Sequence, residues 1–171
     1  MKWIGGAILI IITFFWIGIE FANRMEKRPK LIRTLKNALL ILEAEIVYSQ
    51  TAVQDACIHI SKQVPQPIAL FFEQVGLRLK NENRELYSIW EQEVELFWNS
   101  VPLFSDEKEI MKQFGRTLGQ HDTVQQQKYI QLALTHLNNK HTEAEEMYQR
   151  YGKISKSLGF LTGILIALLL L

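Results

Sequence analysis

The two apolar runs at the ends of the chain constrain its fold more than any other feature of the sequence. Residues 3–19 include no charged residue and ten Ile, Leu or Phe residues, and residues 158–171 contain ten more. Each such side chain favours insertion into a bilayer by roughly 0.3–0.6 kcal/mol. A helix over the first run is about 25 Å long at ~1.5 Å per residue, close to the ~30 Å hydrocarbon core. We therefore predict transmembrane helices at residues 1–21 and 154–171.

Each run also has an alternative interpretation. Lys2 before the first run is typical of a cleaved signal peptide, but residues 17–20 (IGIE) lack small residues at the A-x-A spacing of a cleavage site. The second run is short for a membrane crossing and is compatible with a buried core helix, although Lys153 and Lys156 can lengthen the span by snorkelling. The near absence of polar residues from both runs favours the membrane.

Small residues recur every four positions around the second run. They are Ser155, Gly159, Gly163 and Ala167, and the central pair forms a G-x-x-x-G motif. In a membrane helix this spacing lets a neighbouring helix approach closely. We expect this face to pack against the first run or another subunit. Chance spacing is the alternative, because glycine is common in membrane helices.

Basic residues flank both runs on the side of the chain's middle. They are Arg24, Lys27, Arg28, Lys30 and Arg33 after the first run, and Arg150, Lys153 and Lys156 before the second. Because positive residues are retained in the cytoplasm, these flanks predict that residues 22–153 are cytoplasmic and that both termini lie on the far side of the membrane. The first cluster is expected at the membrane surface. A nucleic-acid patch is the alternative, but the adjacent apolar run favours lipid head groups, and we expect no nucleic-acid partner.

The middle of the chain has the periodicity of helices. Apolar residues recur every three or four positions, and only four prolines and nine glycines interrupt the whole chain. The expected helices cover residues 29–48, 53–64, 66–79, 86–98 and 105–118, and a sixth begins at residue 122 and continues toward the second apolar run. Short connections between such helices predict an all-α, six-helix bundle within residues 22–153.

Local signals mark the ends of these helices. Pro29 is expected in the first turn of the first helix. The side-chain oxygens of residues 49–51, Ser105 and Asp122 are expected to cap the second, fifth and sixth helices respectively. Gly119 is expected to end the fifth helix.

The sequence carries no recognisable pattern of catalytic or metal-binding residues. Phosphate-binding loops, dinucleotide-binding motifs, nucleophile elbows and zinc-protease motifs are all missing. The single cysteine, Cys57, lies on an apolar helix face and cannot form a disulfide within the chain. We therefore predict a protein that is not an enzyme and that needs no cofactor or metal. A phosphate-accepting histidine at His59 or His121 is the alternative, motivated by the helical bundle alone.

Charge is balanced overall but not along the chain. Nineteen Lys and Arg residues oppose eighteen Asp and Glu residues, which argues against a general nucleic-acid binder. Between Glu43 and Asp122, however, thirteen acids oppose seven bases, a difference of −6. Three of these acids, Glu91, Glu93 and Glu95, are expected to face a basic partner. An ordinary solvated surface is the alternative.

Three stretches of the chain carry a resemblance to a known family. They are residues 42–49 (LEAEIVYS), residues 114–122 (FGRTLGQHD) and residues 157–163 (SLGFLTG). In their order and spacing they resemble the stage III sporulation protein AB family of endospore-forming bacteria, and the resemblance extends almost from end to end. That family is similar in its cytoplasmic helical domain to the inner-membrane platform protein of type II secretion and type IV pilus systems.

The resemblance implies a function and partners that the residues alone do not. It implies a non-enzymatic platform in the channel apparatus between mother cell and forespore, located in the outer forespore membrane with its domain in the mother-cell cytoplasm. The implied partners are the secretion-type ATPase of the same operon and other membrane subunits of the channel. This chain has one helical domain where the platform proteins have two, so a homo-oligomer is also expected. The alternative function is a membrane-tethered signalling module that carries phosphate on histidine.

Overall fold

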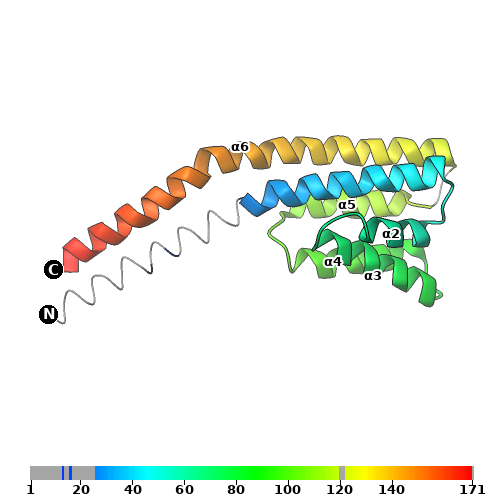
Figure 1. Cartoon of the computed structure of the whole chain (residues 1–171), viewed down its shortest axis with the longest axis horizontal. Coiled ribbons are helices and arrows are strands. Elements are labelled where there is room, and N and C mark those ends of the chain that lie inside the picture. The colour runs from blue at the N-terminus through cyan, green and yellow to red at the C-terminus, as the bar shows by residue number, and fades with distance from the viewer. Residues whose placement is uncertain (1–12, 14–15, 17–25, 120–121, 171) are drawn as a thin grey trace. The chain divides into compact units, whose positions relative to one another are not determined.

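The computed structural model describes Thr13, Trp16, residues 26–119 and residues 122–170, with side chains described as far as Tyr151 (Figure 1). Every regular element in these residues is a helix, as predicted, and they include no strand. Residues 26–43 are α-helical and lead into a π-helical turn, η1 (Ala44–Tyr48). The helices that follow are α2 (Val53–Ser61), α3 (Ile68–Asn81), α4 (Leu86–Trp98), α5 (Ser105–Thr117) and α6 (Thr123–Leu170).

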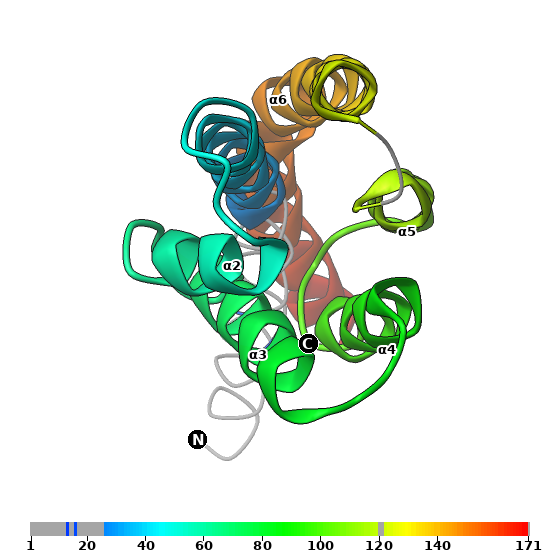
Figure 2. The same cartoon turned by 90° about the vertical axis from the view of Figure 1, so that its right-hand side faces the viewer.

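The described chain divides into two compact units. Residues 30–141 form one unit, and residues 26–29 with 142–170 belong to the other. Within the first unit, α2 packs on α3, α3 on α4, and α4 on α5. In Figures 1 and 2, the helix that leads into η1 lies beside the first part of α6 in this unit, and α2 to α5 complete the bundle. The six predicted helices are therefore confirmed in the described residues.

The signals at the end of α5 and the start of α6 were interpreted correctly. Gly119 follows α5 with a φ of +77°, a conformation that glycine adopts without steric cost. Asp122 precedes α6, and its Oδ1 accepts a hydrogen bond from the Gln125 backbone N–H at 2.9 Å. This bond satisfies one of the free donors of the first helical turn. From there α6 is one continuous helix to Leu170, as the sequence analysis suggested.

Three other predicted boundaries are wrong. The first helix does not begin at Pro29, because residues 26–28 are already helical. Residues 49–51 do not cap α2, whose N-cap is Ala52, because the Thr51 hydroxyl donates to Glu45 Oε2 at 2.9 Å instead. Ser105 lies inside α5, and Phe104 precedes the helix. There the carboxylate of Glu107 accepts the Phe104 backbone N–H at 2.8 Å, which is one half of a capping box.

The core of the first unit is built around Trp90, which is fully buried. Its ring centroid lies 5.2 Å from that of Phe71 and 5.6 Å from that of Phe114, both in edge-to-face arrangements that aromatic pairs favour. Its Nε1–H donates to the backbone carbonyl of Met111 at 2.7 Å. Gly115 makes room for the indole, because a Cβ there would lie 2.1 Å from Trp90 Cδ1. The α4–α5 contact therefore requires a glycine at this position.

The two predicted transmembrane helices are not tested by the described residues. Among those residues, no helix has both the length and the apolar character that a membrane crossing needs. Of residues 1–21, only Thr13 and Trp16 are described. The backbone of residues 154–170 is helical, but the side chains of Ser155, Gly159, Gly163 and Ala167 lie outside the described ones.

Candidate functional site

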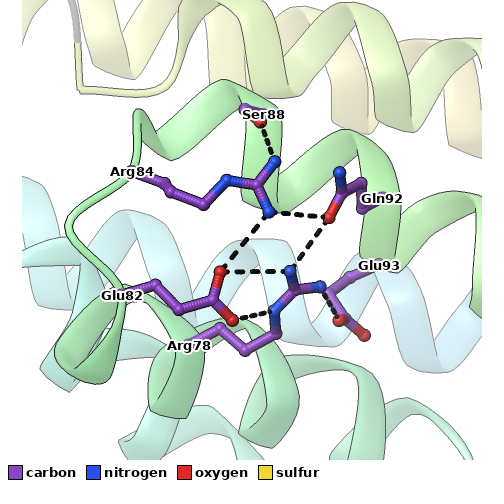
Figure 3. A network of polar contacts seen from close by, with 6 residues as sticks. All are labelled: Arg78, Glu82, Arg84, Ser88, Gln92 and Glu93. Carbon is purple, nitrogen blue, oxygen red and sulfur yellow. Dashed lines mark hydrogen bonds and ion pairs between the residues drawn. The ribbon is translucent and has the colours of Figure 1, made fainter.

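Arg78, on α3, forms hydrogen bonds with side chains of α4 and of the end of α3 (Figure 3). The Arg78 Nε donates to Glu82 Oε1 at 2.7 Å, and its Nη1 donates to Glu93 Oε1 at 2.6 Å. Its Nη2 bonds Gln92 Oε1 at 2.9 Å. These charge-assisted bonds raise the pKa of the Arg78 guanidinium and lower that of the Glu82 carboxyl, in each case chiefly through the hydrogen bonds between the two groups. Arg78 thus connects the end of α3 to the exposed side of α4.

Arg84, in the connection between α3 and α4, completes this network (Figure 3). Its Nη2 donates to Ser88 Oγ at 2.7 Å and its Nη1 to Gln92 Oε1 at 3.1 Å. Its ion pair with Glu82 is longer, at 3.4 Å. The side chain of Arg84 is 41% exposed, whereas that of Arg78 is 22% exposed. Arg84 is therefore the peripheral member of the network, and Arg78 is its centre.

Glu93 does not face a partner as predicted. The residue is buried, with 7% of its surface exposed, and its carboxylate binds Arg78. The physical reason is the helical period, which places residue 93 about 200° from its neighbours two positions away. Glu91 and Glu95 are four residues apart and share the other face, where their side chains are 38% and 44% exposed.

Glu91 and Glu95 form ion pairs with lysines of α5. Glu95 binds both Lys108 and Lys112, and Lys112 also lies 3.5 Å from Glu91. The hydrogen bond from Lys108, followed by that from Lys112, lowers the pKa of the Glu95 carboxyl, and the bond to Glu95 raises the pKa of Lys112. These four residues, called the α4–α5 seam below, are therefore a set of half-exposed ion pairs and not an unpaired acidic surface.

Leu96, on α4, is an exposed leucine next to these ion pairs. Leu96 is 63% exposed, although it lies on a helix whose other apolar side chains are largely buried. It lines a shallow, open depression together with Glu91, Gln92, Glu95 and Lys112. Single exposed apolar side chains are common on protein surfaces, so the feature that distinguishes Leu96 is its position in this depression beside the ion pairs of α4 and α5. Sequence analysis did not select Leu96, although its break with the apolar stripe of α4 could have indicated it.

The basic residues predicted at the membrane surface differ in exposure. Lys27, Lys30 and Arg33 are exposed, and Arg24 lies outside the described residues. Arg28 does not fit the prediction, because it is 4% exposed.

Arg28 is held within the unit formed by residues 26–29 and 142–170. Its Nη2 lies 3.5 Å from Glu143 Oε1, and its Nη1 lies 3.5 Å from Met147 Sδ. Burial of an arginine normally requires such a carboxylate partner. Arg28 therefore contributes to the contact between the first helix and α6.

The histidines and the cysteine show no metal centre. Among the described residues, no group of three His, Cys, Asp or Glu side chains lies close enough to hold a metal ion. His59 Nδ1 lies 3.2 Å from Glu45 Oε2, and His121 lies outside the described residues. Cys57 is fully buried, as expected for a core residue, and burial raises the pKa of its thiol to about 12.

Glu43 and Glu107 are also buried carboxylates, and neither was predicted to be buried. Glu43 lies on the helix that leads into η1. It is 7% exposed and accepts hydrogen bonds from the Gln127 and Gln131 side chains of α6, at 3.0 and 2.6 Å. The signal in the sequence was its place beside Leu42, on the same apolar stripe as Leu39 and Ile46. Charge alone suggested a solvated residue.

Comparison with known proteins agrees with this all-helical bundle. Residues 2–171 match the family model described as stage III sporulation protein AB. Stage III sporulation protein AB of Bacillus subtilis (strain 168) is 42% identical over 166 residues, which cover 97% of each chain. A solved structure of stage III sporulation protein AB is 41% identical, with a TM-score of 0.67 over 71% of this chain and 96% of that one. The chain therefore belongs to the stage III sporulation protein AB family.

Proposed function

We propose that this protein is a non-enzymatic membrane platform of the secretion-like channel apparatus between mother cell and forespore. The apolar runs anchor it in the outer forespore membrane, and the helical bundle extends into the mother-cell cytoplasm. There the bundle binds the secretion-type ATPase of the same operon and couples it to the membrane subunits of the channel. Both chain termini lie on the far side of the membrane.

The main support for this proposal is the extent of the family match. The match to a sporulation family extends from residue 2 to residue 171, so it includes both apolar runs as well as the bundle between them. An apolar run at each end of the chain, with basic residues on its inner side, suits a cytoplasmic domain held at a membrane by two anchors. The bundle offers an exposed apolar side chain, Leu96, beside the α4–α5 seam, which suits a binding role.

Cysteine labelling in intact sporulating cells tests the topology. Cysteines introduced at exposed positions of the bundle, such as Lys62 and Glu73, are expected to resist a membrane-impermeant maleimide added from outside the mother cell. The same residues are expected to react once the mother-cell membrane is permeabilised. Cys57 adds little background because it is buried. Failure of these cysteines to react after the mother-cell membrane alone is permeabilised would contradict the proposed orientation, because the bundle would then lie behind the outer forespore membrane.

We place the ATPase contact on the surface of α4 around Leu96, with Glu91 and Glu95 at its edge. This surface replaces the predicted triplet, because reversing the charge of Glu93 would disrupt the Arg78 network before it affected any partner. Burial of a leucine of this exposure contributes about 1.5–3 kcal/mol when it is complete. An arginine at the same position would replace this apolar side chain by a longer, charged one that must lose its hydration when the surface is covered.

Leu96→Arg is expected to weaken capture of the ATPase at least tenfold, which corresponds to about 1.4 kcal/mol or more. Leu70→Arg is the matched control, because Leu70 is also an exposed leucine of this bundle, at 44%, but lies on α3. Binding is measured with purified full-length protein in detergent, together with its melting temperature. Equal binding by the two variants, with equal melting temperatures, would place the ATPase contact elsewhere.

A phosphate-accepting His59 remains as a second candidate because of one contact. Glu45 holds His59 through Nδ1, which leaves Nε2 of a half-exposed imidazole available to solvent. Phosphate that is acid-labile, located on His59 and lost in His59→Gln would support a signalling module. Absence of such phosphate in sporulating cells would leave His59 as a surface residue paired with Glu45.

A further inference from the structure

The contact between the first helix and α6 contains a buried carboxylate whose bonding is unusual. Glu43 is 7% exposed, and its two oxygens bind two different side chains of α6. Oε1 accepts from Gln127 Nε2 at 3.0 Å, and Oε2 accepts from Gln131 Nε2 at 2.6 Å. Both partners are neutral carboxamides. Each carboxylate oxygen is therefore satisfied by a separate turn of the opposite helix.

A buried carboxylate bound only by neutral donors is expected to contribute little to the free energy of folding. A carboxylate that leaves water loses solvation, and neutral donors restore less of that loss than a cation does. Replacement of buried ionic groups by apolar side chains of similar volume is often neutral or stabilising. Gln127 is half-buried and Gln131 is exposed, so both amides can return to water if the carboxylate is removed. The Glu43 site therefore calls for an explanation other than stability.

The apolar contacts of this helix pair do not by themselves specify how far one helix lies along the other. Buried leucines recur in the first helix at Leu35, Leu39 and Leu42, and similar side chains recur in α6 at Ile130, Leu134 and Leu137. A shift of one turn replaces one aliphatic contact by another. A repeat of similar aliphatic side chains determines which helix faces pack together, but it determines the axial register only weakly. In coiled coils, a single buried polar residue is known to fix the register.

Glu43, in contrast, can form hydrogen bonds with both Gln127 and Gln131 in only one register of the two helices. Gln127 and Gln131 are four residues apart, so they occupy adjacent turns of α6. A shift of one turn leaves at most one of them opposite Glu43 and brings the shorter side chain of Thr123 or Thr135 into the other place, so the two carboxamide bonds are lost as a pair. A second polar contact has the same register: Lys36 Nζ donates to Asn138 Oδ1 at 2.6 Å, seven residues from Glu43 on one helix and seven from Gln131 on the other.

We infer that Glu43, held by Gln127 and Gln131, fixes the axial register of α6 against the first helix. The α-helical part of the first helix ends at this residue, because the wider π-helical turn of η1 begins at Ala44. Both helices lead toward the predicted membrane segments. A fixed register means that a displacement at the distal end of the pair reaches both segments without slippage. This role does not depend on the ATPase or on the topology of the chain.

Disulfide trapping in the full-length protein tests the inference. The native register is reported by the pair Lys36→Cys/Asn138→Cys, whose side chains are in contact. Shifted registers in either direction are reported by Leu40→Cys/Asn138→Cys and Lys36→Cys/Thr135→Cys. All four positions have side chains at least partly exposed to oxidant, and buried Cys57 does not compete. Rates of crosslinking are compared in the original background, in Glu43→Met and in Glu45→Met.

In the original background the native pair is expected to crosslink at least about tenfold faster than either shifted pair. Glu43→Met should reduce this preference to within about threefold while the melting temperature stays the same or rises. Glu45→Met is the matched control, because Glu45 is a nearby carboxylate that binds Thr51 and His59 instead of α6, and it should leave the preference unchanged.

Two results would overturn the register role. One is an unchanged preference in Glu43→Met. The other is a marked loss of melting temperature in Glu43→Met, which would show that the carboxylate simply stabilises the fold. Glu43→Gln keeps the size of the side chain and one acceptor oxygen, and it is expected to retain most of the preference for the native pair. A loss of preference in Glu43→Gln equal to that in Glu43→Met would also contradict the role assigned to the acceptor atoms.

Discussion

Gly115→Ala is expected to lower the free energy of unfolding by about 3 kcal/mol or more, because the added methyl group meets the buried indole of Trp90. The new Cβ would lie 2.1 Å from Trp90 Cδ1 and 2.6 Å from Trp90 Nε1. The indole cannot move aside easily, because its Nε1–H is bonded to Met111 and its ring packs against Phe71 and Phe114. Urea or thermal unfolding of the full-length protein measures the change.

A matched pair of variants separates this clash from an effect on the helix itself. Gln113→Ala changes an exposed position of the same helix and should alter stability by no more than about 0.5 kcal/mol. In Gly115→Ala/Trp90→Phe the smaller ring leaves room for the methyl group, so the double variant should be more stable than the sum of the single changes predicts. Strict additivity of the two single changes would contradict the close contact between Gly115 and the Trp90 indole.

Arg78→Met is expected to cost about 2–4 kcal/mol, because it leaves Glu93 as a buried carboxylate without its cation. Glu93 is 7% exposed, and Arg78 Nη1 is its partner at 2.6 Å. Arg84→Met is the matched control at the edge of the same network, and its cost should be no more than about 0.5–1 kcal/mol because the side chain is more exposed.

The double variant Arg78→Met/Glu93→Met should recover much of the lost stability, because no charge then remains buried. If Arg78→Met and Arg84→Met cost the same, the two arginines would be equivalent surface residues. A double variant less stable than Arg78→Met would show that Glu93 has a partner other than Arg78.

The helices were predictable because their pattern is local. Apolar positions such as Leu35, Leu39 and Leu42 repeat with the helical period, and Gly119 and Asp122 mark boundaries through preferences of their own backbone and side chain. The π-helical turn and the capping role of Glu107 were not predictable in the same way. Both depend on which of several nearby acceptors and donors meets its partner in the folded chain.

The candidate site was predictable only in part. Glu91, Glu93 and Glu95 were grouped by their charge, although the helical period already separates Glu93 from the other two. The apolar stripe of the first helix could have indicated the burial of Glu43, but the partners of Arg28 and Glu43 could not be predicted, because they lie on α6, 84 to 119 residues away. Leu96 interrupts a polar face, and that irregularity is visible in the sequence once the period of α4 is known.

The ion pairs between α4 and α5 make this surface responsive to dissolved salt. Glu91 and Glu95 are half-exposed, so counterions can screen their attraction to the lysines, with a Debye length of about 8 Å at physiological ionic strength and about 3 Å at 1 M. The contacts of Trp90 are inaccessible to ions. A titration with sodium chloride should therefore weaken the ion pairs between α4 and α5 and leave the packing around Trp90 unchanged. The same titration would separate the Coulombic from the apolar contribution to the binding of any partner on this face.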